Sequence, residues 1–561
     1  MDITGRKLFV KALKEEGVDT IFAYPGGMIT DIVDELYKTE GIRVVLGRHE
    51  QALVHEAEGY ARATGKTAVV LVTSGPGATN TITGIADAYY DSIPIVIFTG
   101  QVPLHLIGND AFQEVDIVGM TRSITKFGVT VRDRDSMGRL IKMGFQIAGT
   151  GKPGPVLIDI PKDIQVATGD PEYPKSVDIR GYHPNESVHI GQLKKAYRLL
   201  KSAKQPLIIA GGGVRISGAE EKLLQLAKKM SIPVTTTIMG KGVMPSDEPL
   251  YIGNCGMHGR YACNKAISEC DVLFSVGTRF NDRITGDLER FAPNAQIIHV
   301  DIASASISRN VVVDVPITAD AKAALEKLLS FAEEMDNSKW LEKIKAWDKE
   351  HPLVMGRGKI GLCPQDICQA INEVFPDANI VTDVGQHQMW ATQYIDINKG
   401  QKLITSGGLG TMGFGFPAAL GAKIGDSKKP VVLITGDGGF QMNMQEMAMA
   451  MVEKVPVVIC LFNNTYLGMV RQMQQLFYGK RYEITDLKAE DGTYYPDFME
   501  WAKAYGIEAT RIEKEEEIKS ALNKARDNKK GPTLLEFIIT PEDLVLPVVK
   551  SGSALSEMIL K

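Results

Sequence analysis

The stretch from residue 430 to residue 464 constrains the fold of this chain more than any other. An apolar run there ends in Gly436, Asp437 and Gly438, a helical pattern follows, and a second apolar run ends just before Asn464. Two apolar runs joined through a helix predict a βαβ unit, whose strands are parallel and adjacent and whose crossover is right-handed. The expected elements are a strand at 431–435, a helix at about 440–453 and a strand at 455–462.

Asp437 and Asn464 are then expected at the same edge of a sheet, beside the N-terminus of a helix. Open α/β sheets bind ligands at the carboxyl ends of their strands, and helix N-termini favour anions. One carboxylate and one amide oxygen leave coordination sites open on a hard cation such as Mg2+, and phosphate oxygens can complete them. The sequence therefore predicts a diphosphate–magnesium site. The alternative is an ordinary turn that carries an Asp and an Asn by accident.

Composition narrows the class of protein. At 561 residues the chain is too long for one hydrophobic core, and about 150 residues per domain predicts three or four domains. The net charge of -5 gives no reason to expect nucleic acid or an anionic membrane as a partner, and no apolar run approaches the roughly 20 residues that span a bilayer. The N-terminal pattern is helical rather than that of a signal peptide, and six sparse cysteines predict reduced thiols, not disulfides or zinc ligands. We expect a cytoplasmic protein.

Three stretches alternate strand and helix patterns, which predicts an α/β fold with three doubly wound parallel-sheet domains. We expect the domains at 1–170, 188–345 and 360–540, a polar linker at 165–187 and a C-terminal tail at 541–561 that docks back on the body. The other expected elements are helices at 5–16 and 31–38, strands at 20–24, 43–46, 68–73, 95–99, 206–210, 272–276 and 296–300, a strand at the end of 149–161, and a charged helical connector at 322–350.

Glu50 stands out in the first domain. It follows an expected strand and begins a helix whose other positions are largely Ala, Leu, Tyr and Gly. A partly desolvated carboxyl group there is expected to have a raised pKa and to exchange a proton near neutrality. A carboxylate favoured by the helix dipole explains this position alone equally well. A zinc site is excluded, because His49 and His55 lack the i, i+4 spacing of a metalloprotease motif.

Other candidate residues carry weaker signals. The small-residue loop 74–80 allows a ligand to approach the backbone. The long stretch 100–126 carries Gln113 and Lys126, although Lys126 alone would pass for a solvated surface charge.

In the second domain, a run of three glycines, 211–213, follows a strand, and Asp301 stands at the end of another. Such residues suit a phosphate and a ribose, but the GxGxxG fingerprint is absent. A nicotinamide dehydrogenase is therefore only a weak alternative. In the third domain, Gly385 follows a strand, and the glycine-rich run from Ser406 allows backbone contact with a planar ligand.

Together these segments resemble the catalytic subunit of acetohydroxyacid (acetolactate) synthase, a family of thiamin diphosphate (thiamine pyrophosphate) enzymes with three α/β domains. The resemblance runs from about residue 3 to residue 558 and implies, in order, a pyrimidine-binding, a central FAD-binding-like and a diphosphate-binding domain. The motifs that carry it are YPGG (24–27), RHEQ (48–51), GYARATGK (59–66), TSGPGATN (73–80), GQVP (100–103), DAFQE (110–114), GMHG (256–259), RFNDRITG (279–286), DVGQHQMWA (383–391), TSGGLGTMGFG (405–415) and GMVRQ (468–472).

The resemblance implies how the cofactor is held. Glu50 is expected to bind the aminopyrimidine ring and exchange the proton that activates the thiazolium ring, and Met412 to hold the two rings in a bent conformation. Asp437, Asn464 and the backbone carbonyl of Tyr466 are expected to hold Mg2+ against the diphosphate. The matching motifs add to the cofactor site Pro25, Gly26, Gly27, Gly385, Gln386, His387, Gly410, Gly436, Gly438, Gly439, Gly468 and Met469.

The implied reaction decarboxylates pyruvate and joins the remaining two-carbon unit to a second 2-keto acid. Pyruvate as acceptor gives 2-acetolactate and 2-ketobutyrate gives 2-aceto-2-hydroxybutyrate, which are precursors of branched-chain amino acids. Arg283 is expected to bind the carboxylate of the second acid, a role that suits a permanently charged fork. Gln113 and Lys126 are expected to line the same channel.

The resemblance also implies FAD without a redox role, and a homodimer or tetramer. Each active site is expected between the first domain of one chain and the third domain of another. A small regulatory subunit is a further partner that the family allows and that nothing in this chain requires. The residues expected around FAD are Gly211, Gly212, Gly213, Gly256, His258, Arg279 and Asp301.

Some positions depart from the family pattern. Met473 replaces a usual tryptophan, which predicts weaker preference for 2-ketobutyrate and weaker sensitivity to herbicides. Phe127 stands where histidine is common and Asn281 where aspartate is common. Ser304–Ser306 replaces a usual Pro-Ala-Glu, which weakens the expectation of FAD.

Two further interpretations stay open. A catabolic, FAD-independent acetolactate synthase or a simple 2-keto acid decarboxylase shares the cofactor, although Gln113 and Arg283 argue against the decarboxylase. A binding or regulatory protein that has lost catalysis keeps the fold, but Glu50, Asp437 and Asn464 are intact.

Overall fold

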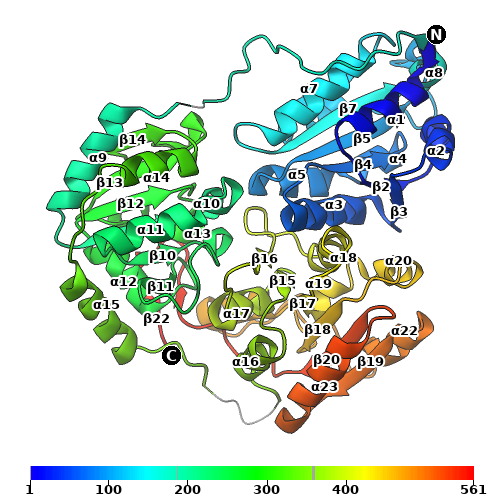
Figure 1. Ribbon diagram of the computed structural model, residues 1–561. Coiled ribbons are helices and arrows are strands. Elements are labelled where there is room, and N and C mark those ends of the chain that lie inside the picture. Colours follow the sequence, from blue (N-terminus) through cyan, green and yellow to red (C-terminus); the bar gives the residue numbers. More distant parts are fainter. Residues whose placement is uncertain (1, 186, 357–360) are drawn as a thin grey trace. The chain divides into compact units, whose positions relative to one another are not determined.

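The structure, a computed structural model, describes residues 2–185, 187–356 and 361–561. The described residues form two compact units (Figure 1). The first unit comprises Met1–His183, Ala378–Gly385 and Ile404–Ile538, and the second comprises Pro184–Asp377, Gln386–Leu403 and Ile539–Lys561, apart from the residues outside the described ranges.

The first unit contains a six-stranded sheet from the N-terminal part of the chain, in the order β3-β2-β4-β5-β7-β6 among the described residues. All its neighbouring strands are parallel. The strands are β2 (Thr20–Tyr24), β3 (Arg43–Leu46), β4 (Ala68–Val72), β5 (Ile95–Gln101), β6 (Phe127–Thr130) and β7 (Pro155–Pro161). The helices are α1 (Gly5–Glu15), α2 (Thr30–Tyr37), α3 (Glu50–Thr64), α4 (Pro76–Thr79), α5 (Ile82–Asp91), α6 (Ile117–Thr121), α7 (Met137–Gly149), α8 (Lys162–Val166), η1 (Gly27–Ile29) and η2 (Leu104–Leu106). A short antiparallel pair, β1 (Ile3–Thr4) with β8 (Thr168–Gly169), lies outside this sheet.

The same unit contains a second six-stranded sheet, in the order β16-β15-β17-β18-β20-β19 within the described ranges. The pairs from β15 to β19 are parallel. The strands are β15 (Asn379–Thr382), β16 (Leu403–Ile404), β17 (Val431–Gly436), β18 (Val458–Asn463), β19 (Glu508–Ile512) and β20 (Thr533–Ile538). The helices are α18 (Gly415–Gly425), α19 (Asp437–Phe440), η6 (Met444–Glu446), α20 (Met447–Val452), α21 (Gly468–Phe477), α22 (Phe498–Ala504) and α23 (Glu515–Asp527).

The second unit is built on a third sheet, in the order β11-β10-β9-β12-β13-β14 among its described residues, and every neighbouring pair is parallel. The strands are β9 (Pro206–Ala210), β10 (Val234–Thr236), β11 (Tyr251–Asn254), β12 (Val272–Val276), β13 (Gln296–Asp301) and β14 (Val315–Thr318). The helices are α9 (Ile190–Ser202), α10 (Gly212–Ile216), α11 (Glu220–Met230), α12 (Tyr261–Glu269), α13 (Asp282–Thr285), α14 (Ala321–Leu329), α15 (Ser338–Glu350), α16 (Pro364–Val374), α17 (Gln386–Tyr394), η3 (Ile238–Gly240), η4 (Leu288–Arg290) and η5 (Ser304–Ser306). The predicted fold class, three parallel-sheet α/β domains, is confirmed.

The predicted domain boundaries stay predictions, and those at residues 1 and 360 lie outside the described residues. Two predicted helices are wrong in extent. The helix expected at 440–453 is broken into α19, η6 and α20, because the side chain of Asn443 turns back to donate to the Gly413 carbonyl at 2.8 Å. The charged stretch 322–350 forms two helices, and α15 is more than a solvated connector because it buries Trp340 and Ile344.

Two helices of the first unit, α3 and α18, lie side by side in Figure 1 and pack closely. A Cβ atom built on Gly59 of α3 would lie 1.9 Å from the Ala418 carbonyl oxygen. A Cβ atom built on Gly421 of α18 would lie 1.8 Å from the Glu56 carbonyl oxygen. Each helix therefore presents a glycine to the backbone of the other, and this close approach joins the cores that flank the two sheets of the unit.

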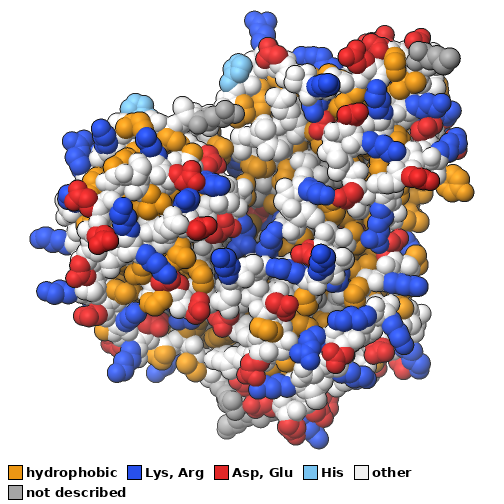
Figure 2. Space-filling view, in the orientation of Figure 1, with side chains coloured by type: hydrophobic (Ala, Val, Ile, Leu, Met, Phe, Trp, Pro, Cys, Tyr) orange, Lys and Arg blue, Asp and Glu red, His pale blue; other side chains and the backbone are white. Residues whose placement is uncertain are grey.

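The C-terminal segment packs on the second unit, as predicted for the tail. Its strands β21 (Val548–Val549) and β22 (Met558–Ile559) pair with each other, and the backbone N–H of Val549 donates to the Met257 carbonyl at 2.9 Å. None of the helices in the described ranges combines the length and apolar character that crossing a bilayer requires. Figure 2 shows basic and acidic side chains interspersed over the visible face, in keeping with the small net charge.

Candidate active site

The predicted βαβ unit places Asp437 and Asn464 at one sheet edge. Strands β17 and β18 are parallel neighbours, paired up to Gly436 and Phe462, so both polar residues stand just beyond the paired ends. Both side chains are buried, with 2% of Asp437 and 7% of Asn464 exposed. The structure confirms that the strands before Asp437 and Asn464 are parallel neighbours that end at the same sheet edge, as predicted.

Tyr495 belongs to this edge, although its sequence context carried no signal for it. Its hydroxyl donates to Asp437 Oδ2 at 2.8 Å and lies 3.1 Å from Asn463 Oδ1. Burial raises the pKa of Asp437 to about 7, while hydrogen bonds from Tyr495 and from backbone N–H groups lower it. A bound cation would favour the ionised carboxylate and so offset this cost of burial.

The loop after Asn464 is held by side-chain to backbone hydrogen bonds. The backbone N–H of Tyr466 donates to Asn464 Oδ1, and that of Thr465 donates to Asn463 Oδ1, both at 3.0 Å. Thr465 has a φ of 62°, which only such a fixed turn stabilises in a β-branched residue. An amide oxygen has two lone pairs, so the side chain of Asn464 is of a type that can accept a hydrogen bond and also coordinate a cation. Gly468 and Met469 begin α21 directly after this loop.

Gly438 and Met412 form the floor of the same edge. A Cβ atom at Gly438 would lie 2.6 Å from Leu467 Cδ2, 3.5 Å from Leu487 Cδ1 and 3.8 Å from Met412 Cε. A side chain at Gly438 would clash with Leu467, so this position next to the buried Asp437 requires a glycine and is surrounded by apolar groups. Leu467 and Leu487 were not predicted, since nothing local distinguishes them from core residues.

Asp383 organises the glycine-rich loops beside Gly438. Its buried carboxylate accepts hydrogen bonds from the backbone N–H groups of Gly413 at 3.0 Å and Gly415 at 2.9 Å. A Cβ atom at Gly439 would lie 2.5 Å from Asp383 Oδ1, so the same carboxylate also requires a glycine there. Gly410 precedes this loop with a φ of 76°, a left-handed conformation that favours glycine. Gly385 also adopts a positive φ, 153°.

Glu50 begins α3 and is 9% exposed. The Asn80 amide donates to Glu50 Oε2 at 2.9 Å, and His49 Nδ1 lies 3.4 Å from the same oxygen. The predicted raised pKa is wrong for this structure. Burial does raise it, but the hydrogen bonds from His49 and Asn80 outweigh burial and leave the pKa of Glu50 lowered.

Three loops meet around Glu50 at the edge of the N-terminal sheet. A Cβ atom at Gly75 would lie 2.8 Å from Gln113 Cβ, and one at Gly77 would lie 3.5 Å from Glu50 Oε1. A Cβ atom at Gly26 would meet Thr73 at 2.5 Å, which packs the Pro25–Gly27 turn onto the start of the same loop. Glu50 and Gln113 therefore both lie against the small-residue loop 74–80, and their roles stay predictions.

Glu446 connects the loop before Glu50 to the C-terminal sheet. Its carboxylate accepts a hydrogen bond from the backbone N–H of Arg48, with distances of 2.9 and 3.1 Å to its two oxygens. Sequence reasoning missed Glu446, because its partner lies almost 400 positions away. Among the described residues, the polar partners of Glu50 itself are Asn80 and His49, which both belong to the N-terminal sheet domain.

Lys126 is held by the helix that precedes β7. Its ammonium group donates to the carbonyls of Ile147 and Thr150 at the C-terminus of α7 and to the Tyr182 hydroxyl, the last two at 2.8 and 3.3 Å. Burial lowers the pKa of Lys126 to about 8. These contacts account for Lys126 as a helix-capping residue, and its role in a substrate channel stays a prediction.

The glycine run 211–213 of the second unit packs against a neighbouring strand end. Cβ atoms at Gly211 and Gly213 would lie 2.2 Å from the Gly277 carbonyl oxygen and 2.7 Å from Gly277 Cα. Close packing of β9 against β12 therefore requires both glycines. A Cβ atom at Gly212 would lie 3.1 Å from Met239 Cβ.

Arg283 lies beside the GMHG segment. The backbone N–H of Met257 donates to the Arg283 carbonyl at 2.8 Å, and a Cβ atom at Gly256 would meet that oxygen at 2.6 Å. The Arg283 guanidinium is 61% exposed and lies 3.7 Å from Asp282. Its positive charge is therefore presented to solvent next to His258, where a carboxylate can reach it.

The residues of the second unit fit an additional polar ligand. The buried atoms His258 Nδ1 and Asn281 Oδ1 have no hydrogen-bond partner among the described residues. Asp301 ends β13 and accepts from the Ala303 backbone N–H at 2.8 Å, and the Arg279 carbonyl accepts from Asn310 at 3.3 Å.

Gln386 and His387 also belong to the second unit, whereas Gly385 belongs to the first. The Gln386 side chain donates to the Asp543 carbonyl at 2.9 Å.

Three family models match the chain, in the order of its three sheets. They describe the N-terminal TPP binding domain of thiamine pyrophosphate enzymes at residues 3–120, the central domain at 193–328 and the C-terminal TPP binding domain at 383–537. The matched segments contain Glu50, the glycine run 211–213, and Asp437 with Asn464, respectively.

Curated relatives match almost the whole chain. A probable acetolactate synthase large subunit of Methanocaldococcus jannaschii is 46% identical over 568 residues, which cover 99% of this chain and 95% of the relative. An acetolactate synthase large subunit of Corynebacterium glutamicum is 44% identical, covering 99% and 90%. That of Haemophilus influenzae is 42% identical, covering 100% and 98%.

Proposed function

Because this chain belongs to the acetolactate synthase large subunits of the thiamine pyrophosphate enzymes, we propose that its two cofactor-binding sheet edges together join two 2-keto acids. The reaction is decarboxylation of pyruvate and transfer of the two-carbon unit to a second acid. The observation that carries the proposal is the presence of Glu50 at one edge and Asp437 with Asn464 at the other, in a chain that matches these relatives over its full length. The catabolic alternative is not favoured, since the relatives are large subunits.

At the C-terminal sheet, Asp437, Asn464 and the Tyr466 carbonyl hold Mg2+, and the cation holds the diphosphate. The donor set supports this assignment, because Mg2+ prefers oxygen ligands and retains open positions for phosphate. Met412 would orient the rings of the cofactor, and its Cε lies 3.8 Å from the position that a Cβ atom at Gly438 would take. When bound, thiamine pyrophosphate supplies the electron sink that decarboxylation of a 2-keto acid requires.

Glu50 moves the proton that activates the cofactor. In the structure, hydrogen bonds from Asn80 and His49 hold its pKa low. With the cofactor bound, further burial would favour the protonated carboxyl group, and Glu50 would exchange a proton with the pyrimidine ring. Gln113, which packs against Gly75 of the loop 74–80, lines the path of the substrate with Lys126.

Arg283 binds the carboxylate of the second 2-keto acid. Its exposed guanidinium, with the weak surface pair to Asp282, can change partners at little cost. FAD binds along the carboxyl edge of the third sheet, where Gly212, Arg279, Asp301 and the unpartnered atoms of His258 and Asn281 provide polar groups. FAD has a structural rather than a redox role there.

The assembly is at least a homodimer in which Glu50 of one chain meets the diphosphate edge of another. Two observations support this arrangement. The polar partners of Glu50 among the described residues, Asn80 and His49, come from its own N-terminal domain, and Phe112, next to Gln113, is 84% exposed. A small regulatory subunit and a cytoplasmic location complete the proposal, the latter supported by six free thiols.

One assay tests the function. Purified protein is expected to form acetolactate from pyruvate only with thiamine pyrophosphate and Mg2+, and to require FAD for full activity. Full activity from flavin-free protein would show that this enzyme is a FAD-independent acetolactate synthase. Acetaldehyde as the main product would make it a decarboxylase.

A further inference from the structure

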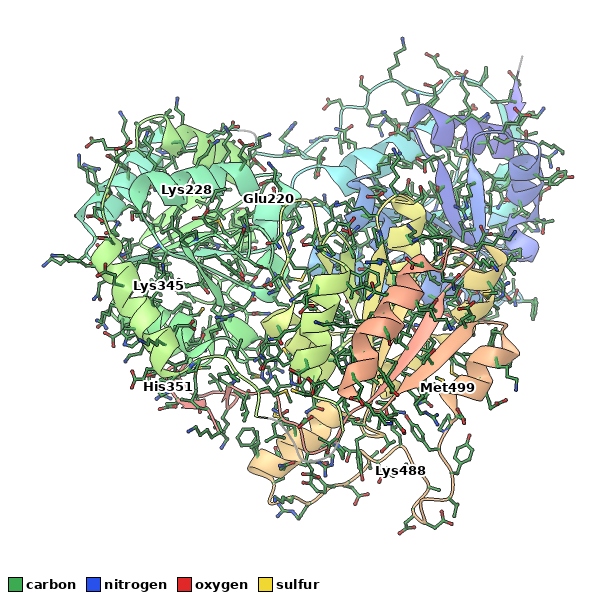
Figure 3. All side chains as sticks on the ribbon, turned by 60° about the horizontal axis from the view of Figure 1, so that its bottom comes forward. Glu220, Lys228, Lys345, His351, Lys488 and Met499 are labelled. Atoms are coloured by element: carbon green, nitrogen blue, oxygen red, sulfur yellow. The ribbon has the colours of Figure 1, made fainter. Side chains whose placement is uncertain are left out.

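A cavity in the second unit, outside the residues assigned to either cofactor, contains an unpaired buried lysine. The cavity has a volume of about 170 Å³ and lies between the end of β11, helices α12 and α15, and the segment around Gln393. Lys241, Asn254 and Gln393 line its buried part, whereas Lys345 and Asp396 are exposed at its mouth. Figure 3 labels Lys345 on α15.

Lys241 is 5% exposed, and its ammonium group has no hydrogen-bond acceptor or ion-pair partner among the described residues. Its backbone is fixed, because Arg215 donates to the Lys241 carbonyl at 3.0 Å and Gly242 adopts a φ of 86° against Ile397. Burial lowers the pKa of Lys241 to about 8, Arg260 lowers it further and Asp396 raises it, so the side chain still carries a charge at neutral pH. A buried charge without an ion pair is unfavourable unless a ligand of opposite charge pairs with it.

Arg260 adds a second positive charge to the cavity. A Cβ atom at Gly253 would lie 2.9 Å from Arg260 Nε and 2.6 Å from its Cδ, so this glycine lets the arginine lie against the end of β11. Arg260 lies 3.5 Å from Asp348 Oδ2, and Asp396 accepts from the Asn372 amide at 3.5 Å. With Lys345, the lining carries three cations and two carboxylates: Asp348 pairs with Arg260, whereas Asp396 attracts Lys241 without forming an ion pair among the described residues.

The cavity also contains two acceptors without donors. The buried oxygens Asp348 Oδ1 and Gln393 Oε1 have no hydrogen-bond partner in the described part of the chain. A ligand that satisfies the whole lining must accept hydrogen bonds from Lys241 and Arg260 and also donate one. Hydrogen phosphate has both properties, whereas sulfate at neutral pH has no proton to donate.

We propose that this cavity is a binding site for a small oxyanion that carries a hydroxyl group, of which inorganic phosphate is the simplest. Lys241 and Arg260 bind the charged oxygens, and the hydroxyl donates to Asp348 or Gln393. The volume excludes a nucleotide, because sites for ligands of that size occupy about 300 Å³ or more. The site does not depend on the proposed reaction.

The test uses the holoenzyme saturated with thiamine pyrophosphate, Mg2+ and FAD, so that the other phosphate-binding groups are occupied. Amine acylation followed by peptide mass spectrometry reports the reactivity of each lysine in wild-type protein. Phosphate is expected to slow the acylation of Lys241 at least tenfold, and sulfate at equal ionic strength to have a much smaller effect. Lys349, exposed on the same helix as Lys345 but outside the cavity, is expected to react equally in all buffers.

Equilibrium dialysis with labelled phosphate gives an independent measurement. Wild-type holoenzyme is expected to bind one phosphate per chain. Lys241→Met, which keeps the volume of the side chain, is expected to bind at least tenfold more weakly, and Lys349→Met to bind as the wild type does. Unprotected Lys241, equal protection by sulfate, or unchanged binding by the Lys241→Met variant would overturn the proposal. If that variant does not fold, the acylation result decides.

Discussion

Single residues decide the chemistry of this chain, and Glu50 is the clearest case. Its place at the start of α3 follows from the sequence, but its protonation does not. The carboxyl group is buried enough to raise its pKa, and two donors, His49 and Asn80, reverse the shift. The same side chain can therefore be an anion before the cofactor binds and a proton donor once the ring has displaced water.

Replacing Glu50 with Gln tests that role. Glu50→Gln is expected to lower acetolactate formation by about 100-fold to 10,000-fold, the usual contribution of general acid–base catalysis, and to leave cofactor affinity largely unchanged. Initial rates and calorimetric titration with thiamine pyrophosphate measure the two effects. Glu40→Gln, at an exposed carboxylate of the same domain, is the control. Turnover equal to that of wild type would show that Glu50 has no catalytic role.

We expect Met473 to govern the choice of acceptor. It is half-buried on α21, one turn after Gly468 and Met469. The wild type is expected to show little preference for 2-ketobutyrate over pyruvate. Met473→Trp is expected to raise the ratio of acetohydroxybutyrate to acetolactate about tenfold, because a larger apolar surface favours the longer acid. A competition reaction with equal amounts of the two acids gives this ratio directly. A wild-type enzyme that strongly favours acetohydroxybutyrate would contradict the assignment.

At the scale of elements, the contact between α3 and α18 determines how the two sheets of the first unit share a core. Both helices have a glycine where the other's backbone approaches, and neither glycine is needed for the helix itself. A glycine inside a helix costs about 1 kcal/mol relative to alanine. The gain is a close approach that aligns α3, and with it Glu50.

Gly421→Ala tests this contact. Because the new Cβ atom would lie 1.8 Å from the Glu56 carbonyl oxygen, the helices must separate, and we expect a loss of about 3 kcal/mol in the free energy of unfolding. The shift of the first transition in urea measures it. Gly356→Ala, where a Cβ atom meets nothing within 4 Å, serves as the reference and should cause little change. Equal stability of the two variants would show that α3 and α18 tolerate a wider spacing.

At the scale of the whole molecule, the active site is expected to need two chains. Two inactive variants, Glu50→Gln and Asp437→Asn, are expected to recover activity when they are mixed, unfolded and refolded together. Random pairing makes half of the dimers mixed, and each mixed dimer has one intact site, so about a quarter of the wild-type activity should return. If each chain builds its own site, the mixture stays as inactive as its components.

A buried ionisable cluster should make stability depend on pH. His55, Glu58 and Asp87 have ligand-type atoms within 4.8 Å of one another, and Arg62 Nη2 lies 3.2 Å from Glu58 Oε2. Burial raises the pKa of Glu58 to about 8, although Arg62 lowers it. The folded protein therefore holds this proton more tightly than the unfolded chain. The stability that the proton contributes is complete below about pH 4 and is lost as the pH rises through 8.

Glu58→Gln removes this dependence. Between pH 5 and pH 8, wild type is expected to lose about 3.5 kcal/mol relative to the variant. Thermal unfolding of both proteins across this range measures the difference. Glu342→Gln, at an exposed carboxylate, should follow the wild type at every pH. Parallel curves for wild type and Glu58→Gln would mean that Glu58 is ionised when folded.

The sequence by itself determined the features that depend on neighbouring positions. The period of apolar residues specified parallel α/β sheets, and the order of strand, helix and strand put Asp437 and Asn464 at one edge, because consecutive parallel strands end on the same side. Motifs assigned Glu50 and Arg283. The short strand β6 was not predicted. The helix expected at 440–453 is interrupted at Asn443, whose side chain donates a hydrogen bond to the Gly413 carbonyl.

Only the tertiary structure decided what depends on residues far apart in the chain. The hydrogen bonds that lower the pKa of Glu50, the contact of Glu446 with Arg48, the carboxylate of Asp383 under the glycine loops and the cavity of Lys241 all require a folded chain. Burial and hydrogen bonding set protonation and charge, and both are properties of the neighbours that folding supplies. Residue types along the chain can name a catalytic group, but its electrostatic state is a consequence of packing.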